Sequence, residues 1–513
     1  MKETDQKESL PKYIYLILAN DFGERFCFYG IKSILFIYLK IGFGLDDVQS
    51  KIQTHLFTAF IYLFPLIGAM ISDSYLGKYN TVILFSIIYL IGNILLSVFS
   101  INGLLAQMGK YPYWSFVLSS LLIAIGSGGI KPSVASHAGD QINPEKTRLL
   151  DRLFSMLYII ASVGSLIASY LTPIIVRNVE CFGKPCYFLA YIIPTIIFAF
   201  AIILFAVGKK YYVVAPPVKE FLPWKCLKIS LLGLHEYTKA SPEERAAKGH
   251  FLNFAKEKYG ADLVNETRLL NKVMIILFPL MFFWLLYDQA FTEWQNQYEL
   301  MNQTFLNSFY MSAETSANLN TIFVVILVPL LSDVIYPFFK KIGRPISVVN
   351  RMIIGFSFVI LAFIISTSLT YPVLQYSEGN VVKVDGIQVS CVGCVNCSWQ
   401  IPQWFFLSLG EAMLCVTAVQ FAYTQVGPKL KASSTAVYVL NVAFGNYIVS
   451  GIEEAMALAG FDNPATKQWI FISISSFFFL IFVGLCKFWY ITKEEEEKAL
   501  KQGLQQEFLQ DLK

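Results

Sequence analysis

Residues 187–208 read YFLAYIIPTIIFAFAIILFAVG, a run of 22 residues without a charged side chain. A helix that crosses the hydrocarbon core of a bilayer needs about 20 consecutive, predominantly apolar residues. This stretch therefore predicts a membrane-spanning helix. Runs of similar length recur along the chain on both sides of it, and together they decide the class of protein.

Twelve such runs are predicted, six before a long polar segment and six after it. The composition agrees, because 55% of the 513 residues are hydrophobic and only 15% are charged, unlike soluble domains. Six helices, an interruption and six more are typical of a two-bundle transporter. The sequence thus predicts an all-α polytopic membrane protein, with helices at about 13–40, 48–72, 80–101, 113–137, 150–176, 187–208, 271–297, 312–338, 347–371, 401–426, 433–459 and 468–491.

The polar segment at 209–270 contains eleven Lys or Arg residues, and the short loops on the same side also carry basic residues. An excess of Lys and Arg marks cytoplasmic loops, so this linker and both termini are expected in the cytoplasm. SPEE at Ser241–Glu244 predicts the start of a linker helix. The expected division is an N-terminal tail at 1–12, a bundle at 13–208, the linker at 209–270, a second bundle at 271–491 with a short external loop at 372–400, and a tail at 492–513.

Several classes of function are disfavoured by composition. The net charge of +4 gives no indication of nucleic-acid binding. Only four histidines are present, and neither a nucleophile–base pairing nor zinc-ligand spacing is evident. We therefore expect no enzyme and no metal cofactor.

The nine cysteines are dispersed, and only five of them form clusters, a pair and a trio, both in loops expected outside. A disulfide is expected between Cys181 and Cys186. For Cys391, Cys394 and Cys397, disulfide formation with one cysteine left over is favoured over a metal site, because no fourth ligand is evident. Their state stays open.

The first predicted helix contains DFGERFCFYGIK at residues 21–32, and its ionisable side chains recur at helical spacing. A charge near the bilayer centre costs about 3 kcal/mol or more and is normally kept for a pathway, a proton relay or a ligand. This face must therefore line a protein cavity. The ionisable residues on it are Asp21, Glu24, Arg25 and Lys32.

Four more ionisable residues lie within predicted spans, namely His55, Lys131, Asp288 and Glu411. His55 is either a satisfied core histidine or a proton site. For the carboxylates the alternative to a functional role is a structural ion pair between helices. An ion pair that a proton or substrate can break would also couple binding to opening in an alternating-access carrier.

Several motifs in order resemble the proton-dependent oligopeptide transporters, the peptide-transporter branch of the major facilitator superfamily. They are DFGERFCFYG from residue 21, GAMISDSYLGKYNT from 68, GSGGIKPSVASHAGDQ from 126, FFWLLYDQ from 282, NTIFVVILVP from 320, IPQWFFLSLGE from 401 and NVAFGN from 441. The resemblance covers nearly all twelve spans and implies the major facilitator fold.

The resemblance also implies roles for single residues. Glu24 and Arg25, with Asp21 as the first acid of their motif, belong to proton coupling, as do His55 and Asp288. Lys131 and Lys32 would hold the peptide carboxylate, and Glu411 would face its amino group. The remaining implied cavity positions are Tyr29, Tyr62, Tyr158, Ser162, Trp284, Asn320 and Tyr438.

The chain departs from the family pattern at several of these positions. Asp21 replaces the usual glutamate, Lys32 stands where many members have arginine, and Ser162 and Tyr438 replace an asparagine and a tryptophan. These changes bear on side-chain preference. The short loop at 372–400 means that the large extracellular domain of mammalian members is missing.

The sequence therefore predicts a symporter that moves di- and tripeptides together with protons, with no other cofactor. Its expected partners are peptides, protons and the lipid bilayer, and a plasma-membrane monomer is expected. The alternatives are a carrier of amino acids or nitrate with the same fold, and a sensor that binds peptide without moving it. A cationic and an anionic pole together favour a zwitterion over an inorganic anion.

Overall fold

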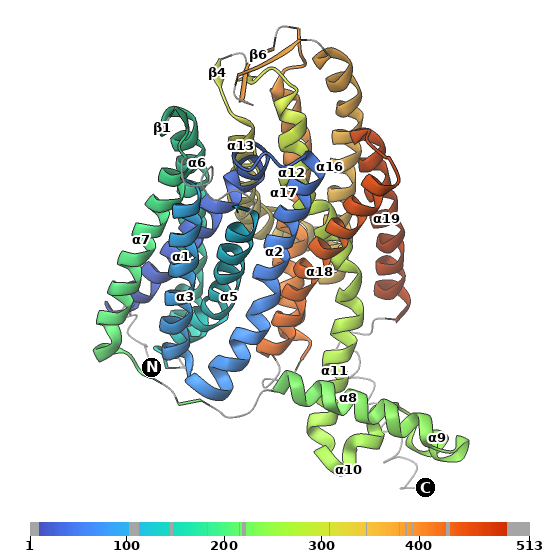
Figure 1. Ribbon diagram of the computed structural model, residues 1–513. Helices are drawn as coiled ribbons and strands as arrows, with labels where there is room; N and C mark the ends of the chain where they lie inside the picture. Colours follow the sequence, from blue (N-terminus) through green and yellow to red (C-terminus); the bar gives the residue numbers. More distant parts are fainter. Residues whose placement is uncertain are drawn as a thin grey trace, which may run out of the picture.

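In the computed structural model, the chain forms two helical bundles joined by a linker of short helices (Figure 1). The structure describes residues 10–101, 112–143, 147–181, 183–214, 216–217, 222–306, 308–344, 346–378, 380–384, 387–391, 393–426 and 431–489. The predicted tail at 492–513 and most of that at 1–12 lie outside these ranges.

The first bundle consists of six long helices whose bounds follow the predicted apolar runs closely. They are α1 (Ile14–Ile37), α2 (Asp47–Ile71), α3 (Lys78–Phe99), α5 (Pro112–Gly139), α6 (Thr147–Asn178) and α7 (Tyr187–Val207). Short turns η1 (Tyr38–Gly42), η2 (Ser72–Leu76) and η3 (Gly208–Tyr211) extend three of them. Pairs α3–α5, α1–α6, α2–α5 and α1–α7 pack together.

The second bundle contains more interrupted helices, because prolines break two of its spans. Pro279 lies in η5 (Phe278–Leu280) between α11 and α12, and Pro329 precedes η6 (Leu330–Ile335) between α14 and α15. The helices are α11 (Ala261–Leu277), α12 (Met281–Glu299), α13 (Ala313–Ser316), α14 (Asn318–Pro329), α15 (Tyr336–Lys341), α16 (Val348–Ser377), α17 (Ile401–Thr424), α18 (Lys431–Leu458) and α19 (Pro464–Gly484), with η7 (Cys397–Gln400) and η9 (Leu485–Trp489).

The linker contains α8 (Leu222–Lys239), α9 (Pro242–Lys248), η4 (Phe251–Ala255) and α10 (Lys256–Tyr259). Ser241 caps α9 as predicted, since its side chain accepts from Glu244 N while Glu244 accepts from Ser241 N. The seventh span begins earlier than predicted. Helix α11 starts at Ala261, and its first turns form a polar, amphipathic segment that precedes the apolar run.

Three two-stranded hairpins lie at the end of the molecule opposite the linker (Figure 1). They pair β1 (Glu180–Cys181) with β2 (Lys184–Pro185), β3 (Thr304–Phe305) with β4 (Phe309–Tyr310), and β5 (Val381–Val384) with β6 (Ile387–Cys391). The structure joins Cys181 to Cys186 and Cys391 to Cys394, and leaves Cys397 free and buried. We call this the hairpin end, and the other the linker end.

Within the described ranges, ten helical segments are long and apolar enough to cross a bilayer. The 24-residue α1 and the 28-residue α18 are also of spanning length, which is consistent with twelve spans. Each bundle has its own hydrophobic core, and α2 packs along α18 where the bundles meet. The all-helical, two-bundle prediction is confirmed, and the chain is an integral membrane protein.

Candidate functional site

A cavity of about 330 Å³ lies between the two bundles, with both contributing to its walls. Helices α1, α2 and α6 supply one wall, and α12, α14, α17 and α18 supply the other. Nine of the residues singled out in the sequence line it, namely Arg25, Tyr29, Lys32, Tyr62, Ser162, Trp284, Asp288, Asn320 and Glu411. The cavity therefore combines cationic, anionic, aromatic and amide groups.

A chain of polar contacts crosses from one bundle to the other at this cavity. Lys32 Nζ on α1 lies 3.1 Å from Asp288 Oδ1 on α12. Asn446 on α18 donates from Nδ2 to Asp288 Oδ2 at 2.7 Å, and its Oδ1 lies 2.8 Å from His55 Nδ1 on α2. The two ends of this chain of contacts, His55 and Lys32, belong to the first bundle. The two residues between them, Asn446 and Asp288, belong to the second bundle.

The surroundings of His55 can accommodate a proton on both ring nitrogens. Asn446 Oδ1 is available as an acceptor for Nδ1–H, because the amide nitrogen of Asn446 donates elsewhere. The Thr292 hydroxyl donates to the Gln289 carbonyl, so its oxygen, 3.3 Å from His55 Nε2, can accept from that nitrogen. An imidazolium would therefore have an acceptor for each N–H.

A second polar cluster lies within the first bundle, next to the cavity. Arg25 Nε is 3.7 Å from Asp21 and 3.6 Å from Glu24. The fully buried Glu24 accepts from Ser127 Oγ at 2.8 Å and lies 4.0 Å from Lys131 Nζ. Of this cluster only Arg25 lines the cavity, so Asp21 and Glu24 would act on it through Arg25.

Lys131 lies behind aromatic rings instead of in the cavity wall. Its Nζ is 4.1 Å from the centre of the Phe28 ring and 4.8 Å from that of Tyr62, and it makes no hydrogen bond within the described residues. The cationic side chains on the wall are Arg25 and Lys32. Contact of Lys131 with a peptide carboxylate stays a prediction.

The anionic side of the cavity is a hydrogen-bonded carboxylate on α17. Asn320 donates from Nδ2 to Glu411 Oε2 at 2.9 Å and contacts the Tyr287 hydroxyl at 3.0 Å. Ser408 donates to Asn320 Oδ1 at 2.6 Å, which fixes the amide orientation. Glu411 is thus held in one position by α14, with its carboxylate at the cavity wall.

The remaining predicted site residues lie around the polar contacts described above. Trp284 lines the cavity with its ring centre 5.1 Å from that of Tyr287 and 6.4 Å from that of Tyr438, which is buried behind it. The side chain of Tyr158 lies outside the described residues. Sequence reasoning did not single out several wall residues, because hydroxyl, amide and aromatic side chains carry no distinct signal in an apolar run. They include Ser165, Ser169, Phe291, Gln295, Asn318 and Thr321.

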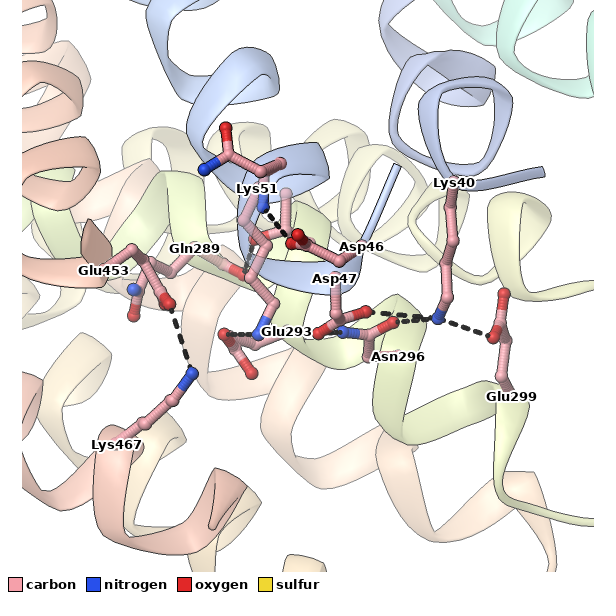
Figure 2. A network of polar contacts seen from close by, with 12 residues as sticks. Lys40, Asp46, Asp47, Lys51, Gln289, Glu293, Asn296, Glu299, Glu453 and Lys467 are labelled. Atoms are coloured by element: carbon pink, nitrogen blue, oxygen red, sulfur yellow. Dashed lines mark hydrogen bonds and ion pairs between the residues drawn. The ribbon is translucent and has the colours of Figure 1, made fainter. Parts of the chain in front are cut away.

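At the hairpin end a network of ion pairs holds the bundles together (Figure 2). Lys40, beyond α1, pairs with Glu299 on α12 at 3.2 Å and with Asp47 on α2 at 3.1 Å. Lys51 on α2 lies 2.5 Å from Glu293 on α12 and 3.2 Å from Asp47. These pairs tie η1 and α2 of the first bundle to α12 of the second. The structure is therefore held closed at the hairpin end.

Cation–π and backbone contacts reinforce this closure beside α6. The Arg177 guanidinium stacks on the Tyr310 ring of β4 at 3.8 Å. Asn318 on α14 donates to the Ser169 carbonyl on α6 at 3.0 Å. Both contacts join the two bundles. Within the described residues no group of His, Cys, Asp and Glu could hold a metal ion.

The family model of the POT family matches residues 79–470, more than half of the chain. The chain belongs to the POT family. It is 32% identical over 405 residues to solute carrier family 15 member 1 of Rattus norvegicus, covering 74% of this chain and 55% of that protein. It is 33% identical over 371 residues to peptide transporter family 1 of Drosophila melanogaster, covering 71% and 48%. The chain thus spans about half the length of these relatives.

Solved structures of the POT family share the fold. The crystal structure of an auto-inhibited POT family peptide transporter aligns with a TM-score of 0.76 at 24% identity, over 94% of this chain and 98% of that one. A POT family transporter in complex with 5-aminolevulinic acid aligns with a TM-score of 0.67 at 18% identity, over 93% and 96%. The predicted family and its two-bundle fold are confirmed.

Proposed function

We propose that this POT family protein is a secondary active transporter that moves di- and tripeptides together with protons by alternating access. The observation that carries this proposal is the contact chain His55–Asn446–Asp288–Lys32, which ties two bundles together through ionisable groups at the wall of a polar cavity. Such a chain lets a proton change the contact between the bundles.

The two poles of the cavity suit a zwitterionic substrate. Arg25 and Lys32 offer cations to a peptide carboxylate, and Glu411 offers an anion to its ammonium group. Aromatic and amide side chains lie between them, and these contact a peptide backbone without selecting one side chain. A crystal structure of a POT family transporter in complex with a thioalcohol-conjugated peptide supports this class of cargo.

The proposed cycle uses only residues of this chain. Protonation of Asp288, or of His55 at the other end of the contact chain, weakens the pair between Asp288 and Lys32 and frees Lys32 for the peptide carboxylate. The bundles then separate at one end and close at the other, and peptide and proton leave together. Each charge moved inward gains about 2.3 kcal/mol per 100 mV of membrane potential.

Uptake of labelled dialanine into proteoliposomes tests the proposal. We expect accumulation that needs an inward proton gradient and is blocked by unlabelled tripeptide, but not by free amino acids or nitrate. Accumulation that is blocked instead by amino acids or nitrate would show that the protein is a carrier of one of those solutes with the same fold. Peptide binding without any uptake by folded protein would identify a sensor.

The proposed setting follows from the charge distribution. By the positive-inside rule, the basic linker supports a cytoplasmic position for the linker end and both termini, so the hairpin end would face outward. A plasma-membrane location and function as a monomer complete the proposal. Labelling of an introduced cysteine at the exposed Leu306, in intact cells and with a membrane-impermeant reagent, tests the orientation.

A further inference from the structure

A buried group of four ionisable residues and one glutamine at the hairpin end lies outside the proposed peptide site. It comprises Lys51 on α2, Gln289 and Glu293 on α12, Glu453 on α18 and Lys467 on α19 (Figure 2). All five are at most 5% exposed. We call this group the outer cluster. None of its members lines the cavity, so peptide binding does not explain why these polar residues are buried here.

Glu453 is the least satisfied member of the outer cluster. Its side chain is fully buried, and neither of its oxygens has a hydrogen-bond partner within the described residues. The nearest ammonium, Lys467 Nζ, is 3.7 Å away, too far for a hydrogen bond. The fully buried Gln289 amide also has neither of its polar atoms paired. The cluster therefore contains buried acceptor oxygens that a proton could satisfy.

The outer cluster is divided unequally between the bundles. In the closed form two lysines balance two glutamates, and the charges of Lys51, Glu293 and Glu453 act on one another. Lys51 is the only member from the first bundle, and Asp47 on its own helix lies 3.2 Å away to keep it paired. When the bundles separate, Glu293 and Glu453 stay together on the second bundle with Lys467 as their single cation.

We propose that Glu293 and Glu453 form a second proton-binding site, which takes up one proton from the outside when the hairpin end opens. Loss of Lys51 leaves one uncompensated carboxylate in a buried setting, which is costly. A proton shared by the two carboxyl groups restores neutrality. When the bundles close again, Lys51 displaces that proton, which returns to the solution outside. The inference deepens the proposed function, because it rests on alternating access by the two bundles.

Other charged groups near the outer cluster do not replace this proton. Lys40, Asp47 and Glu299 form a more exposed layer around it, with Asp47 41% exposed at its side chain. His55 lies one turn further along α2 and is occupied by Asn446 and Thr292. Glu454, the neighbour of Glu453 on α18, is exposed.

The test measures opening directly as a function of pH. Spin labels on Gln49→Cys at the start of α2 and on Leu458→Cys at the end of α18 report the separation of the bundles; both positions are exposed. In nanodiscs without peptide, acidification should increase the widely separated population. Each proton taken up on opening multiplies the open-to-closed ratio by about tenfold per pH unit across the titration range.

Glu453→Gln keeps the shape of the side chain and removes the second carboxylate. In this variant we expect one proton fewer to be taken up on opening, so the open-to-closed ratio should depend less steeply on pH. The part of the pH dependence that is due to His55 and Asp288 should remain. Glu454→Gln is the matched control on the same helix and should keep the full slope. Equal slopes for Glu453→Gln and the unsubstituted labelled protein would overturn the proposal, as would an equal loss in Glu454→Gln.

Lys51→Met provides a second variant if Glu453→Gln does not fold. This substitution removes the cation that is present in the closed outer cluster and absent from the open one. The proton is then bound in both forms, so opening takes up one proton fewer and the pH dependence of the open-to-closed ratio again becomes less steep. An unchanged slope in Lys51→Met would contradict the proposal. The spin-label readout needs no peptide, so failure of the proposed cargo would appear separately, as absent dialanine uptake by a protein that still opens with acid.

Discussion

Asn446 is the residue through which His55 and Asp288 communicate in this structure, because its amide contacts both side chains. Hydrogen bonds to charged groups contribute about 1.5–3 kcal/mol each. We therefore expect Asn446→Ala to lower proton-driven dipeptide uptake by about tenfold or more. Ser450→Ala, one turn along α18, removes only bonds to the backbone carbonyls of Ile52 and Asn446 and should retain most uptake. Comparable losses in both variants would contradict a relay through Asn446.

Glu411 can be tested with the charge of the substrate. Glu411→Gln keeps the size of the side chain but removes the anion that would face the peptide ammonium group. We expect the KM for dialanine to rise about tenfold or more, since a charge-assisted bond becomes a neutral one. For N-acetyl-dialanine, which has no ammonium group, the substitution should change the KM little. If both substrates lost affinity equally, Glu411 would have another role.

At the scale of single elements, close helix packing in the first bundle depends on the glycines of α5. A Cβ atom at Gly126 would lie 2.6 Å from the Cα of Tyr89 on α3, and the backbone of that helix cannot move aside locally. We expect Gly126→Ala to destabilise the protein by about 1–3 kcal/mol, measured as a lower thermal transition in detergent. Gly451→Ala on α18 meets nothing within 4 Å and should leave the transition unchanged or raise it.

The elements also show what a sequence can and cannot predict. The helices followed from apolar runs, since a bilayer crossing demands length and composition alone. The charged face of α1 indicated an interior position, because charges are excluded from lipid. Ion pairs such as that between Lys51 and Glu293 could not be predicted, because a single sequence does not show which helices pack against each other. The early start of α11 was missed because its first turns are polar.

At the scale of the whole molecule, the ion pairs Lys40–Glu299 and Lys51–Glu293 join the bundles at the hairpin end, so these pairs must break for a substrate to enter from that side. The side chains of Lys40 and Glu299 meet across the bundles at 3.2 Å. Cysteines in their place should be cross-linked by a short bis-methanethiosulfonate reagent, which spans the length of the removed side chains, and the cross-link should stop dialanine uptake. Reduction should restore uptake. The native Cys226 would not compete, because it is buried in the linker and burial raises the pKa of its thiol.

The single variant Lys40→Cys, taken through the same cross-linking and reduction, controls for the native disulfides at Cys181–Cys186 and Cys391–Cys394. It should transport equally before and after treatment with the cross-linking reagent. Full uptake by the cross-linked double variant, with the cross-link verified by mass spectrometry, would mean that the hairpin end need not open. Blocked uptake with retained peptide binding from the linker side would instead show that the two ends of the cavity open separately, as two bundles rocking about one central site require.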